Sequence, residues 1–345
     1  MAITIKRLSD ISEYSYDSFI LKKDSNLFYS SYKYCQFLTE LLGCKEDYLI
    51  AIENDEIQGV LPLMYMERDN SRIYNSLPYY GSNGGIITDS QDCYQALLSE
   101  YNLRAQDKST ISSTIVTNPL NPVCSDKYSH NYVDSRIGQI TDIVRKVDSD
   151  SAYQVFALIE PSARRNVRKA LREGISVEKS ANRLTDLEKL HRHNMETISG
   201  TPKTEYFFNL VPEIFKEGDD FDLYTALLGD QVIAALLVFY FGKTVEYFTP
   251  AVSSEYRSVQ PLAAILKVAM EEAISKGFEK WNWGGTWLTQ DGVYRFKRKW
   301  GAKDYKYTYF IQLNECNILN MDRHEIISRY ENFYVVPFGE LTNVK

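Results

Sequence analysis

The residues of this chain best suited to chemistry lie between Trp281 and Gly301. The segment reads Trp-Asn-Trp-Gly-Gly, then a polar loop, then Val-Tyr-Arg-Phe-Lys-Arg-Lys-Trp-Gly. Tandem glycines at the end of a strand allow a backbone to approach a ligand closely. Lys297 lies in the first turns of the helix predicted after them. It is our candidate for a cation that stabilises a tetrahedral oxyanion or a substrate phosphate.

A second cationic segment is a predicted helix that begins at Ser162. It holds cations without an acid among them, in a protein whose formal net charge is −7. These cations are Arg164, Arg165, Arg168, Lys169 and Arg172. Because arginine suits bidentate binding of phosphate, the helix indicates a clamp for a diphosphate or a nucleic-acid backbone. A solvated surface helix is the alternative.

Paired glycines occur in both halves of the chain, beside aromatic residues. Gly84-Gly85 follow Tyr80, and Gly284-Gly285 follow Trp283. The two glycine pairs indicate a cleft that both of them line. The alternative is that each pair only forms a simple turn. His191 and His193 diverge on a predicted helix, so no metal site is expected. The sequence has no nucleophile elbow, Walker loop or dinucleotide fingerprint, so covalent nucleophilic catalysis is not indicated.

Size, charge and cysteine usage limit the classes of protein. A chain of 345 residues predicts two domains. The net charge of −7 argues against wholesale nucleic-acid binding, and we expect no DNA partner. The five cysteines lack a Cys-x-x-Cys pair, as in reduced cytosolic proteins. The longest apolar run, Val232 to Phe241, is about half a membrane span. We expect a cytoplasmic protein with at most peripheral membrane association.

An internal repeat relates the two halves without gaps. Asp47 to Leu63 aligns with Asp222 to Val238, and each copy reads as a strand, a tight Asn-Asp or Gly-Asp turn and a second strand. The alternative is that any two β-hairpins look alike. A third strand, Thr244 to Thr249, has its expected analogue at Ile73 to Leu77.

Helices are expected around these hairpins. The predicted helices are Tyr32 to Leu42, Leu184 to Ser199, Tyr206 to Lys216, Val259 to Lys276 and Val293 to Trp300, and strands are predicted at Phe278 to Trp283 and Tyr305 to Leu313. The fold class is therefore α+β, with mostly antiparallel mixed sheets flanked by helices. The expected domains are 1–150 and 151–314, with a boundary near Asp148 to Ala152. The tail, 315–345, is expected to pack on the first domain.

This order of elements resembles the N-acyltransferase domain of the acetyltransferase (GNAT) superfamily, and the repeat implies two such domains in tandem. The chain resembles in particular the FemAB family, tandem-GNAT enzymes that attach amino acids to peptidoglycan precursors, and their relatives among sugar and surface-polysaccharide N-acyltransferases. The resemblance covers mainly residues 150 to 313. It rests on Arg164 to Ala170, Lys203 to Phe207, Glu246 to Phe248, Trp283 to Gly285, Phe296-Lys297 and Trp300-Gly301.

The resemblance implies that an amine of the acceptor attacks an ester of aminoacyl-tRNA or a thioester, with no acyl-enzyme. Lys297 matches the family lysine that serves the phosphates or the transition state, and Phe296 matches its aromatic neighbour. Lys203 and Tyr206 fall approximately where the family has an arginine and a tyrosine for a nucleotide-linked acceptor. The resemblance also indicates Tyr247 as a substrate-facing tyrosine. Glu246 is a conceivable base.

Two departures from the family leave the donor open. Ala181 to Lys216 cannot hold the helical arm of the tRNA-dependent cell-wall enzymes. The glycine-rich pyrophosphate loop of acetyl-CoA enzymes is also absent, and Arg257 to Pro261 stands in its place. We count Arg257 among the substrate-binding residues. The co-substrates considered are acyl-CoA, acyl carrier protein and aminoacyl-tRNA, with no tightly bound cofactor.

The leading hypothesis is therefore an N-acyltransferase that transfers an acyl or aminoacyl group to an amine of a nucleotide- or lipid-linked sugar or peptidoglycan precursor. One alternative is a tRNA-dependent aminoacyl ligase of the bridge-forming type, which would have tRNA as a partner. Another is a non-catalytic module that binds glycan precursors.

Overall fold

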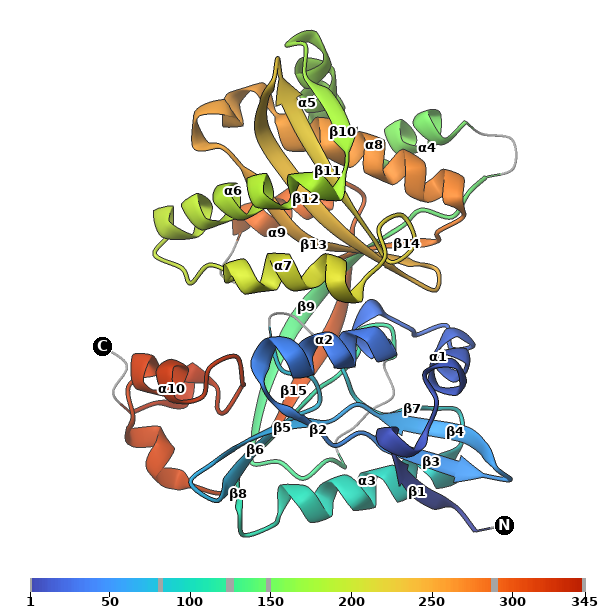
Figure 1. Ribbon diagram of the computed structural model, residues 1–345, viewed down its shortest axis with the longest axis vertical. Coiled ribbons are helices and arrows are strands. Elements are labelled where there is room, and N and C mark those ends of the chain that lie inside the picture. The colour runs from blue at the N-terminus through green and yellow to red at the C-terminus, as the bar shows by residue number, and fades with distance from the viewer. Residues whose placement is uncertain (1, 80–82, 122–126, 147–149, 287–290, 343–345) are drawn as a thin grey trace. The chain divides into compact units, whose positions relative to one another are not determined.

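The computed structural model describes residues 2–79, 83–121, 127–146, 150–286 and 291–342. The chain divides into two compact units. Unit 1 comprises Met1–Ile137 and Lys306–Lys345, and unit 2 comprises Gly138–Tyr305. Both units are α+β (Figure 1). Of the expected boundary near Asp148 to Ala152, residues 148 and 149 lie outside the described residues.

The sheet of unit 2 is mainly antiparallel. Its strands follow the order β10-β11-β12-β13-β14-β9, and β13 with β14 is a parallel pair. The strands are β10 (Ser176–Lys179), β11 (Phe221–Leu228), β12 (Gln231–Phe241), β13 (Thr244–Val252), β14 (Lys280–Thr286), β9 (Tyr132–Asp142) and β15 (Lys303–Leu313). Both β9 and β15 have residues in each unit. The sequence prediction for the strands after Gly277 is thus correct within a few residues.

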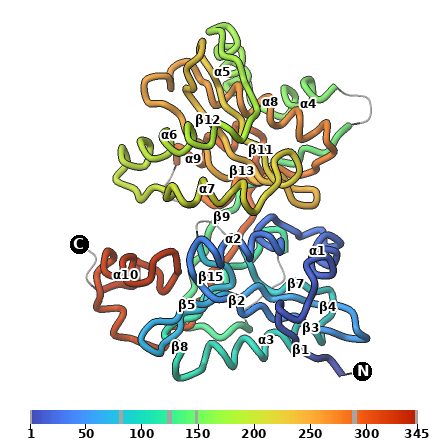
Figure 2. Tube along the Cα trace, viewed as in Figure 1, coloured from blue at the N-terminus to red at the C-terminus, as the bar shows by residue number. Residues whose placement is uncertain are grey.

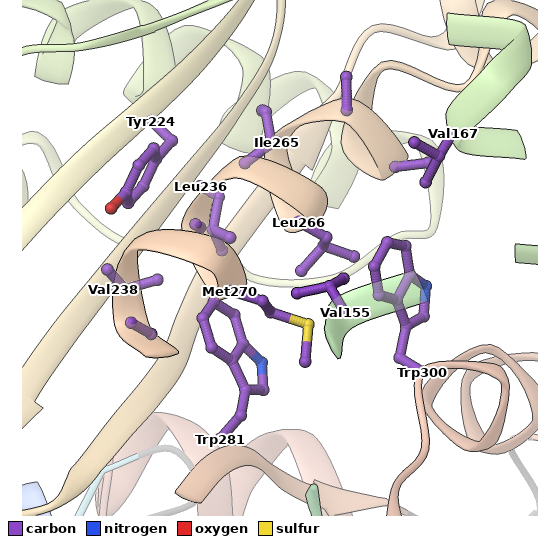
Figure 3. Close-up of a cluster of buried hydrophobic side chains, with 14 of the residues drawn as sticks. Val155, Val167, Tyr224, Leu236, Val238, Ile265, Leu266, Met270, Trp281 and Trp300 are labelled. Carbon is purple, nitrogen blue, oxygen red and sulfur yellow. The ribbon is translucent and has the colours of Figure 1, made fainter. Parts of the chain in front are cut away.

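Helices cover both faces of this sheet. The helices are α4 (Ser151–Leu158), α5 (Pro161–Arg172), α6 (Leu184–Thr197), α7 (Glu205–Ile214), α8 (Pro261–Lys276) and α9 (Asp291–Lys299), with short 3-10 turns η3 (Ala181–Arg183) and η4 (Ser254–Val259). Figure 1 shows α6 and α7 in front of the strands and α8 behind them. The helices α4 and α5 pack on α8. In Figure 3, Leu266 and Met270 of α8 lie among the buried rings of Trp281 and Trp300.

Unit 1 has two sheets. One has the order β1-β3-β4-β7, and the other ends in β15-β8-β6-β5-β2. The strands are β1 (Thr4–Arg7), β2 (Lys45–Glu46), β3 (Leu49–Glu53), β4 (Glu56–Leu61), β5 (Met64–Arg68), β6 (Ser71–Asn75), β7 (Ile87–Thr88) and β8 (Thr110–Val116). The helices are η1 (Leu8–Asp10), α1 (Glu13–Leu21), η2 (Phe28–Ser30), α2 (Tyr32–Leu42) and α3 (Gln91–Ala105).

The C-terminal segment belongs to unit 1. It forms η5 (Cys316–Asn320), α10 (Arg323–Arg329) and η6 (Phe338–Glu340), and the Cα trace in Figure 2 shows it in red. Its backbone is tied to two strands. Asn75 of β6 exchanges hydrogen bonds with the backbone of Tyr334, and Ser112 of β8 donates one to the carbonyl of Val335.

The two predicted hairpins share a structural irregularity as well as a sequence pattern. In β3 and β4 the register shifts between Ala51 and Ile52. In β11 and β12 it shifts between Ala226 and Leu227, at the corresponding positions of the repeat. A β-bulge is a specific feature that unrelated hairpins do not need to share. The repeat therefore reflects two copies of one supersecondary unit.

The third strand of the repeat differs between the units. In unit 2, β13 pairs antiparallel with β12 along its length and parallel with β14 at its beginning. In unit 1 these two roles are divided, because β6 pairs parallel with β8 whereas β7 pairs antiparallel with β4. The analogue expected at Ile73 to Leu77 is thus only half of the equivalent strand. The other half is β7.

A buried aspartate lies at the start of each hairpin and pairs with cations from equivalent elements. Asp222 accepts a hydrogen bond from Tyr240 at 2.9 Å and lies 3.2 Å from Lys179 of β10 and 3.3 Å from Lys276 of α8. The corresponding Asp47 pairs with Arg7 of β1 and with Arg104 of α3, the latter at 2.8 Å. In both units the pairs fasten the edge strand and the long helix to the hairpin.

Asp222→Ala is expected to lower the free energy of unfolding by about 2 to 3 kcal/mol, because it removes the acceptor of the buried Tyr240 hydroxyl and an ion-pair partner of both Lys179 and Lys276. Urea unfolding followed by circular dichroism measures the change. The control is Asp230→Asn in the exposed turn of the same hairpin, where a change within about 0.5 kcal/mol is expected. Equal losses in both variants would contradict the role assigned to Asp222.

Candidate active site

The site of unit 2 begins where two parallel strands part. Glu246 of β13 and Asn282 of β14 form the last of three parallel pairs, after Thr244 with Lys280 and Val245 with Trp281. Beyond this point β13 stays paired with β12. Its next residues contain a β-bulge around Phe248, opposite Leu237 and Val238. Strands that part leave backbone groups to be paired by other means.

Glu246 and Asn282 are linked at this point. Both side chains are buried, and the Asn282 amide donates a hydrogen bond of 2.7 Å to the Glu246 carboxylate. The amide oxygen of Asn282 accepts a bond of 3.0 Å from the backbone N–H of Gly284. Gly284 has φ +71°, a conformation that side chains disfavour. Asn282 thereby connects the candidate base to the glycine turn.

Lys297 of α9 reaches the other side of the same turn. Its side chain is buried, and its ammonium donates to the carbonyl of Gly285 at 3.0 Å, the hydroxyl of Thr286 at 2.8 Å and the carbonyl of Gly284 at 3.4 Å. Three acceptors match the three N–H bonds of an ammonium. Burial lowers the pKa of Lys297 to about 8, against the opposing effect of the Glu246 carboxylate. The long contact to Gly284 is the one that a substrate oxygen could replace most easily.

The hydroxyl oxygen of Thr286 accepts the hydrogen bond from Lys297, and its own proton points elsewhere. Its proton is donated to the side-chain oxygen of Gln139 at 2.9 Å. The amide of Gln139 donates in turn to Asp304 at 3.3 Å, and Asp304 accepts a bond of 2.7 Å from Tyr294. A hydroxyl has one proton, so this arrangement directs its lone pairs to the lysine. The result is a hydrogen-bonded chain that runs from Glu246 to Asp304 through Lys297.

Aromatic rings pack beside this chain. The ring centroid of Tyr247 lies 4.9 Å from that of Trp283. The Trp283 ring also has Trp281 at 5.8 Å, Phe296 at 6.1 Å and Trp300 at 6.4 Å between centroids. The indole N–H of Trp283 donates to the hydroxyl of Thr141 at 2.9 Å. Burial raises the pKa of Tyr247, which keeps the phenol neutral. The structure therefore brings Tyr247, Trp283 and Phe296 together at the hydrophobic core of unit 2.

Lys203 belongs to a separate aromatic group on the α7 side of β13. Its ammonium lies 5.5 Å from the ring centroids of both Phe207 and Phe248, which stack on each other. Burial lowers the pKa of Lys203 to about 8. Its backbone N–H donates to His191, whose pKa is lowered to about 4 by burial and by Lys203. Tyr206, on the first turn of α7, is exposed.

The cations of α5 and η4 lie apart from the hydrogen-bonded chain. Arg165 and Arg168 are exposed on α5, and Arg257 is exposed on η4, which contacts α5. Arg164 donates to the carbonyl of Ile159 at 2.9 Å. Among the described residues, no contact joins these cations to the group around Lys297, and their role in substrate binding remains a prediction.

Gly84 and Gly85 lie in unit 1, in the segment between β6 and β7. A Cβ atom on Gly84 would come within 2.6 Å of the Ser76 hydroxyl, so glycine is needed there for packing. Tyr80 and Gly81, the start of the predicted glycine loop, lie outside the described residues. A role of Gly84 and Gly85 in substrate binding remains a prediction. Over the described parts of the chain, no group of three His, Cys, Asp or Glu side chains could hold a metal ion.

Three members of the chain of hydrogen bonds escaped the sequence analysis. Asn282 is part of the Trp-Asn-Trp-Gly-Gly motif but was not singled out, although a buried amide between two tryptophans is a usable signal. Thr286 follows the glycines directly. Gln139 is distant in the sequence from both, and no local pattern could have related it to Lys297.

The part of the chain that resembles a known protein family lies mostly in unit 2. Residues 161–307 match the family model of the acetyltransferase (GNAT) domain. Among curated proteins the sequence has no match. The matched residues contain Glu246, Asn282, Thr286 and Lys297, so most of the hydrogen-bonded chain lies in the part of the sequence that matches the GNAT domain model.

Solved structures match nearly the whole chain. FemX is 15% identical, with a TM-score of 0.69, 96% of this chain covered and 100% of that chain. A tandem GNAT protein from the clavulanic acid biosynthesis pathway is 8% identical, with a TM-score of 0.54 and coverages of 90% and 98%. L-PGS from Bacillus licheniformis is 11% identical, with a TM-score of 0.53 and coverages of 88% and 97%. The resemblance to tandem GNAT folds and the predicted α+β fold class are confirmed.

Thr286→Val is expected to lower the pKa of Lys297 below about 8, because it removes an acceptor of the ammonium without changing the shape of the side chain. Titration of the Lys297 side-chain carbon resonances by NMR, assigned with Lys297→Arg, measures this pKa. Thr249→Val is the matched control, since the buried Thr249 hydroxyl has no hydrogen-bond partner among the residues described. An unchanged Lys297 pKa in Thr286→Val would show that the Thr286 hydroxyl does not stabilise the Lys297 ammonium.

Proposed function

We propose that the protein is an N-acyltransferase that transfers an acyl or aminoacyl group to an amine of a nucleotide- or lipid-linked sugar or peptidoglycan precursor. The observation that carries this proposal is the buried pair of candidate base and cation at the parting of β13 and β14. Glu246 and Lys297 come from different elements and are joined through Asn282 and the glycine turn. Their place in a GNAT domain supports acyl transfer as the reaction.

The proposed reaction needs no covalent enzyme intermediate. The acceptor nitrogen forms a bond to the donor carbonyl carbon, the carbon–sulfur or carbon–oxygen bond of the donor breaks, and the leaving group takes up a proton. Glu246 accepts the proton that the amine loses. The Lys297 ammonium stabilises the negative charge on the carbonyl oxygen, and burial strengthens this interaction. Alignment of two bound substrates supplies the remaining advantage.

The aromatic residues provide candidate surfaces for the two substrates. Tyr247 and Phe296, which are partly buried and pack on the buried ring of Trp283, are the candidates for an apolar surface that contacts the body of an acyl group. We place the acceptor on the α7 side, where Lys203 lies beside Phe207 and Phe248 and could pair with an acceptor phosphate. Tyr206, exposed on the same helix, can contact the acceptor as well.

The donor is an activated acyl compound, either acyl-CoA, acyl carrier protein or aminoacyl-tRNA. Helix α8 begins at Pro261, which has no backbone N–H to offer to a phosphate. The preceding turn η4 contains Arg257 but no glycine. This favours binding of donor phosphates by arginine side chains in place of a backbone loop, from Arg257 and from Arg164 on α5, which contacts η4.

The proposal places the reaction in the cytoplasm. The cysteines that the structure describes, Cys35, Cys44, Cys93 and Cys316, are free thiols, as is usual in a reducing compartment. In the described part of the chain, no helix is both long and apolar enough to cross a bilayer.

Lys297→Met is expected to reduce kcat for acyl transfer by about 100-fold or more, because the variant keeps the length of the side chain but removes the charge at the developing oxyanion. Steady-state kinetics with a cognate amine acceptor measures the effect. Lys299→Met, on the same helix and outside the hydrogen-bonded chain, is the control and should keep the wild-type kcat. Equal activity of wild type and Lys297→Met would remove the main support for the proposed mechanism.

The rate of transfer is expected to fall as the pH rises through about 8. At lower pH Lys297 is an ammonium, and above its pKa of about 8 it loses the charge that the transition state requires. Since the pKa of Lys203 is also about 8, the pH profile of kcat is measured in wild type and in Lys203→Gln. The fall near pH 8 should persist in Lys203→Gln. If it disappears there, Lys203 is the titrating group and Lys297 is not.

A further inference from the structure

Helices α4 and α5 form an outer layer of unit 2 with an unusual division of charge. Both pack on α8. The sequence of α4, Ser-Ala-Tyr-Gln-Val-Phe-Ala-Leu, has no charged residue. The sequence of α5, Pro-Ser-Ala-Arg-Arg-Asn-Val-Arg-Lys-Ala-Leu-Arg, has five cations and no acid. An uncharged helix thus lies next to a cationic one on the same outer layer.

The solvent-facing sides of the two helices combine arginine with apolar groups. On α5 the small residues Ala163, Val167 and Ala170 are buried, so Arg165, Arg168 and Arg172 point to the exposed side. Leu171 at the edge of this side is 53% exposed, and Tyr153 of α4 is 71% exposed. The two helices meet where the Arg168 guanidinium lies 5.7 Å from the ring of Phe156. We call this surface, formed by α4 and α5, the α4–α5 face.

No acid neutralises these arginines within the part of the chain that the structure describes. Cations on other helices do have such partners one turn away, for example Arg192 with Glu188 and Lys267 with Glu271. Ion pairs of this kind keep a helix surface soluble at little energetic cost. Their lack on α5, in a chain with net charge −7, leaves a local positive surface that suits an external anion.

We propose that the α4–α5 face docks on a membrane surface that contains anionic phospholipids. Arginine binds headgroup phosphates bidentately, while tyrosine and leucine insert at the boundary between headgroups and acyl chains. The uncharged exposed side of α4 favours a membrane over an RNA, because an RNA backbone would meet no cation along that helix. This inference rests on the α4–α5 face alone and does not depend on the proposed acyl transfer.

Docking would hold unit 2 at the surface where lipid-linked acceptors reside. The attraction is local and electrostatic, so it weakens with ionic strength and needs no membrane-spanning helix. The chemistry shared by a lipid headgroup and a soluble diphosphate is the phosphate itself. The experiment must therefore separate the two sources.

Cosedimentation of the full chain with vesicles tests the proposal. Binding is expected with phosphatidylcholine vesicles that contain phosphatidylglycerol and not with phosphatidylcholine alone, and it should weaken as the salt concentration rises from about 0.1 M to about 0.5 M. The combined variant Arg165→Gln, Arg168→Gln and Arg172→Gln should bind on the order of 100-fold more weakly, at the usual contribution of each basic residue near an anionic surface. Tyr153→Ser should weaken binding without changing its salt dependence.

The control is the combined variant Lys6→Gln, Lys22→Gln and Lys108→Gln, which removes the same charge from exposed positions of unit 1 and should bind like wild type. Thermal unfolding of both combined variants shows that they are folded. The proposal is overturned if the wild-type protein does not cosediment with anionic vesicles. It is overturned as well if the two combined variants lose vesicle binding to the same extent. It is also overturned if a labelled RNA hairpin or inorganic pyrophosphate binds at the arginines while vesicles do not.

Discussion

The parting of β13 and β14 after three parallel pairs is the constraint on which the site depends. Two strands that separate inside a domain expose backbone groups that must be paired, since unpaired buried groups are costly. Here the pairing comes from side chains. Asn282 accepts the N–H of Gly284, and Lys297 donates to the carbonyls of Gly284 and Gly285. The residues that close the gap in the sheet are thus the residues proposed for catalysis.

This coupling explains why the charged groups are tolerated in the interior. Lys297 is buried, and burial lowers its pKa to about 8, yet its ammonium has three acceptors. Gln139 fixes the Thr286 hydroxyl so that it cannot donate to a neutral amine. The chain of hydrogen bonds therefore favours the protonated lysine near neutral pH. A preorganised cation of this kind costs little reorganisation when charge develops on a substrate.

The internal repeat shows how one supersecondary unit gave two different results. Both copies keep the bulged hairpin and the buried aspartate, Asp47 or Asp222, that fastens the edge strand and the long helix. In unit 2 the third strand, β13, is continuous and pairs with both β12 and β14. In unit 1 the equivalent strand is divided between β6 and β7. The Glu246 and Asn282 pair therefore has its setting in unit 2 alone, among the residues described.

The sequence predicted those features whose determinants are local. Hydrophobic periodicity and turn residues placed the hairpins, α2, α6 and α8 within a few residues, and the residue types around Gly284-Gly285 selected Lys297. Long-range features were not accessible. The division of the third strand in unit 1 depends on which strand each segment pairs with, and Gln139 meets Thr286 only in the folded chain. A single sequence contains no record of such pairings.

The most direct test of the proposed function is to detect its product. The purified chain is incubated with an amine-bearing nucleotide- or lipid-linked precursor and with acyl-CoA, acyl carrier protein or aminoacyl-tRNA in turn, and the acceptor is analysed by mass spectrometry. The account predicts a new amide on the acceptor and one equivalent of released thiol or tRNA for each amide, with one donor class. Retention of the precursor without amide formation from any donor would contradict it and would identify the protein as a binding module.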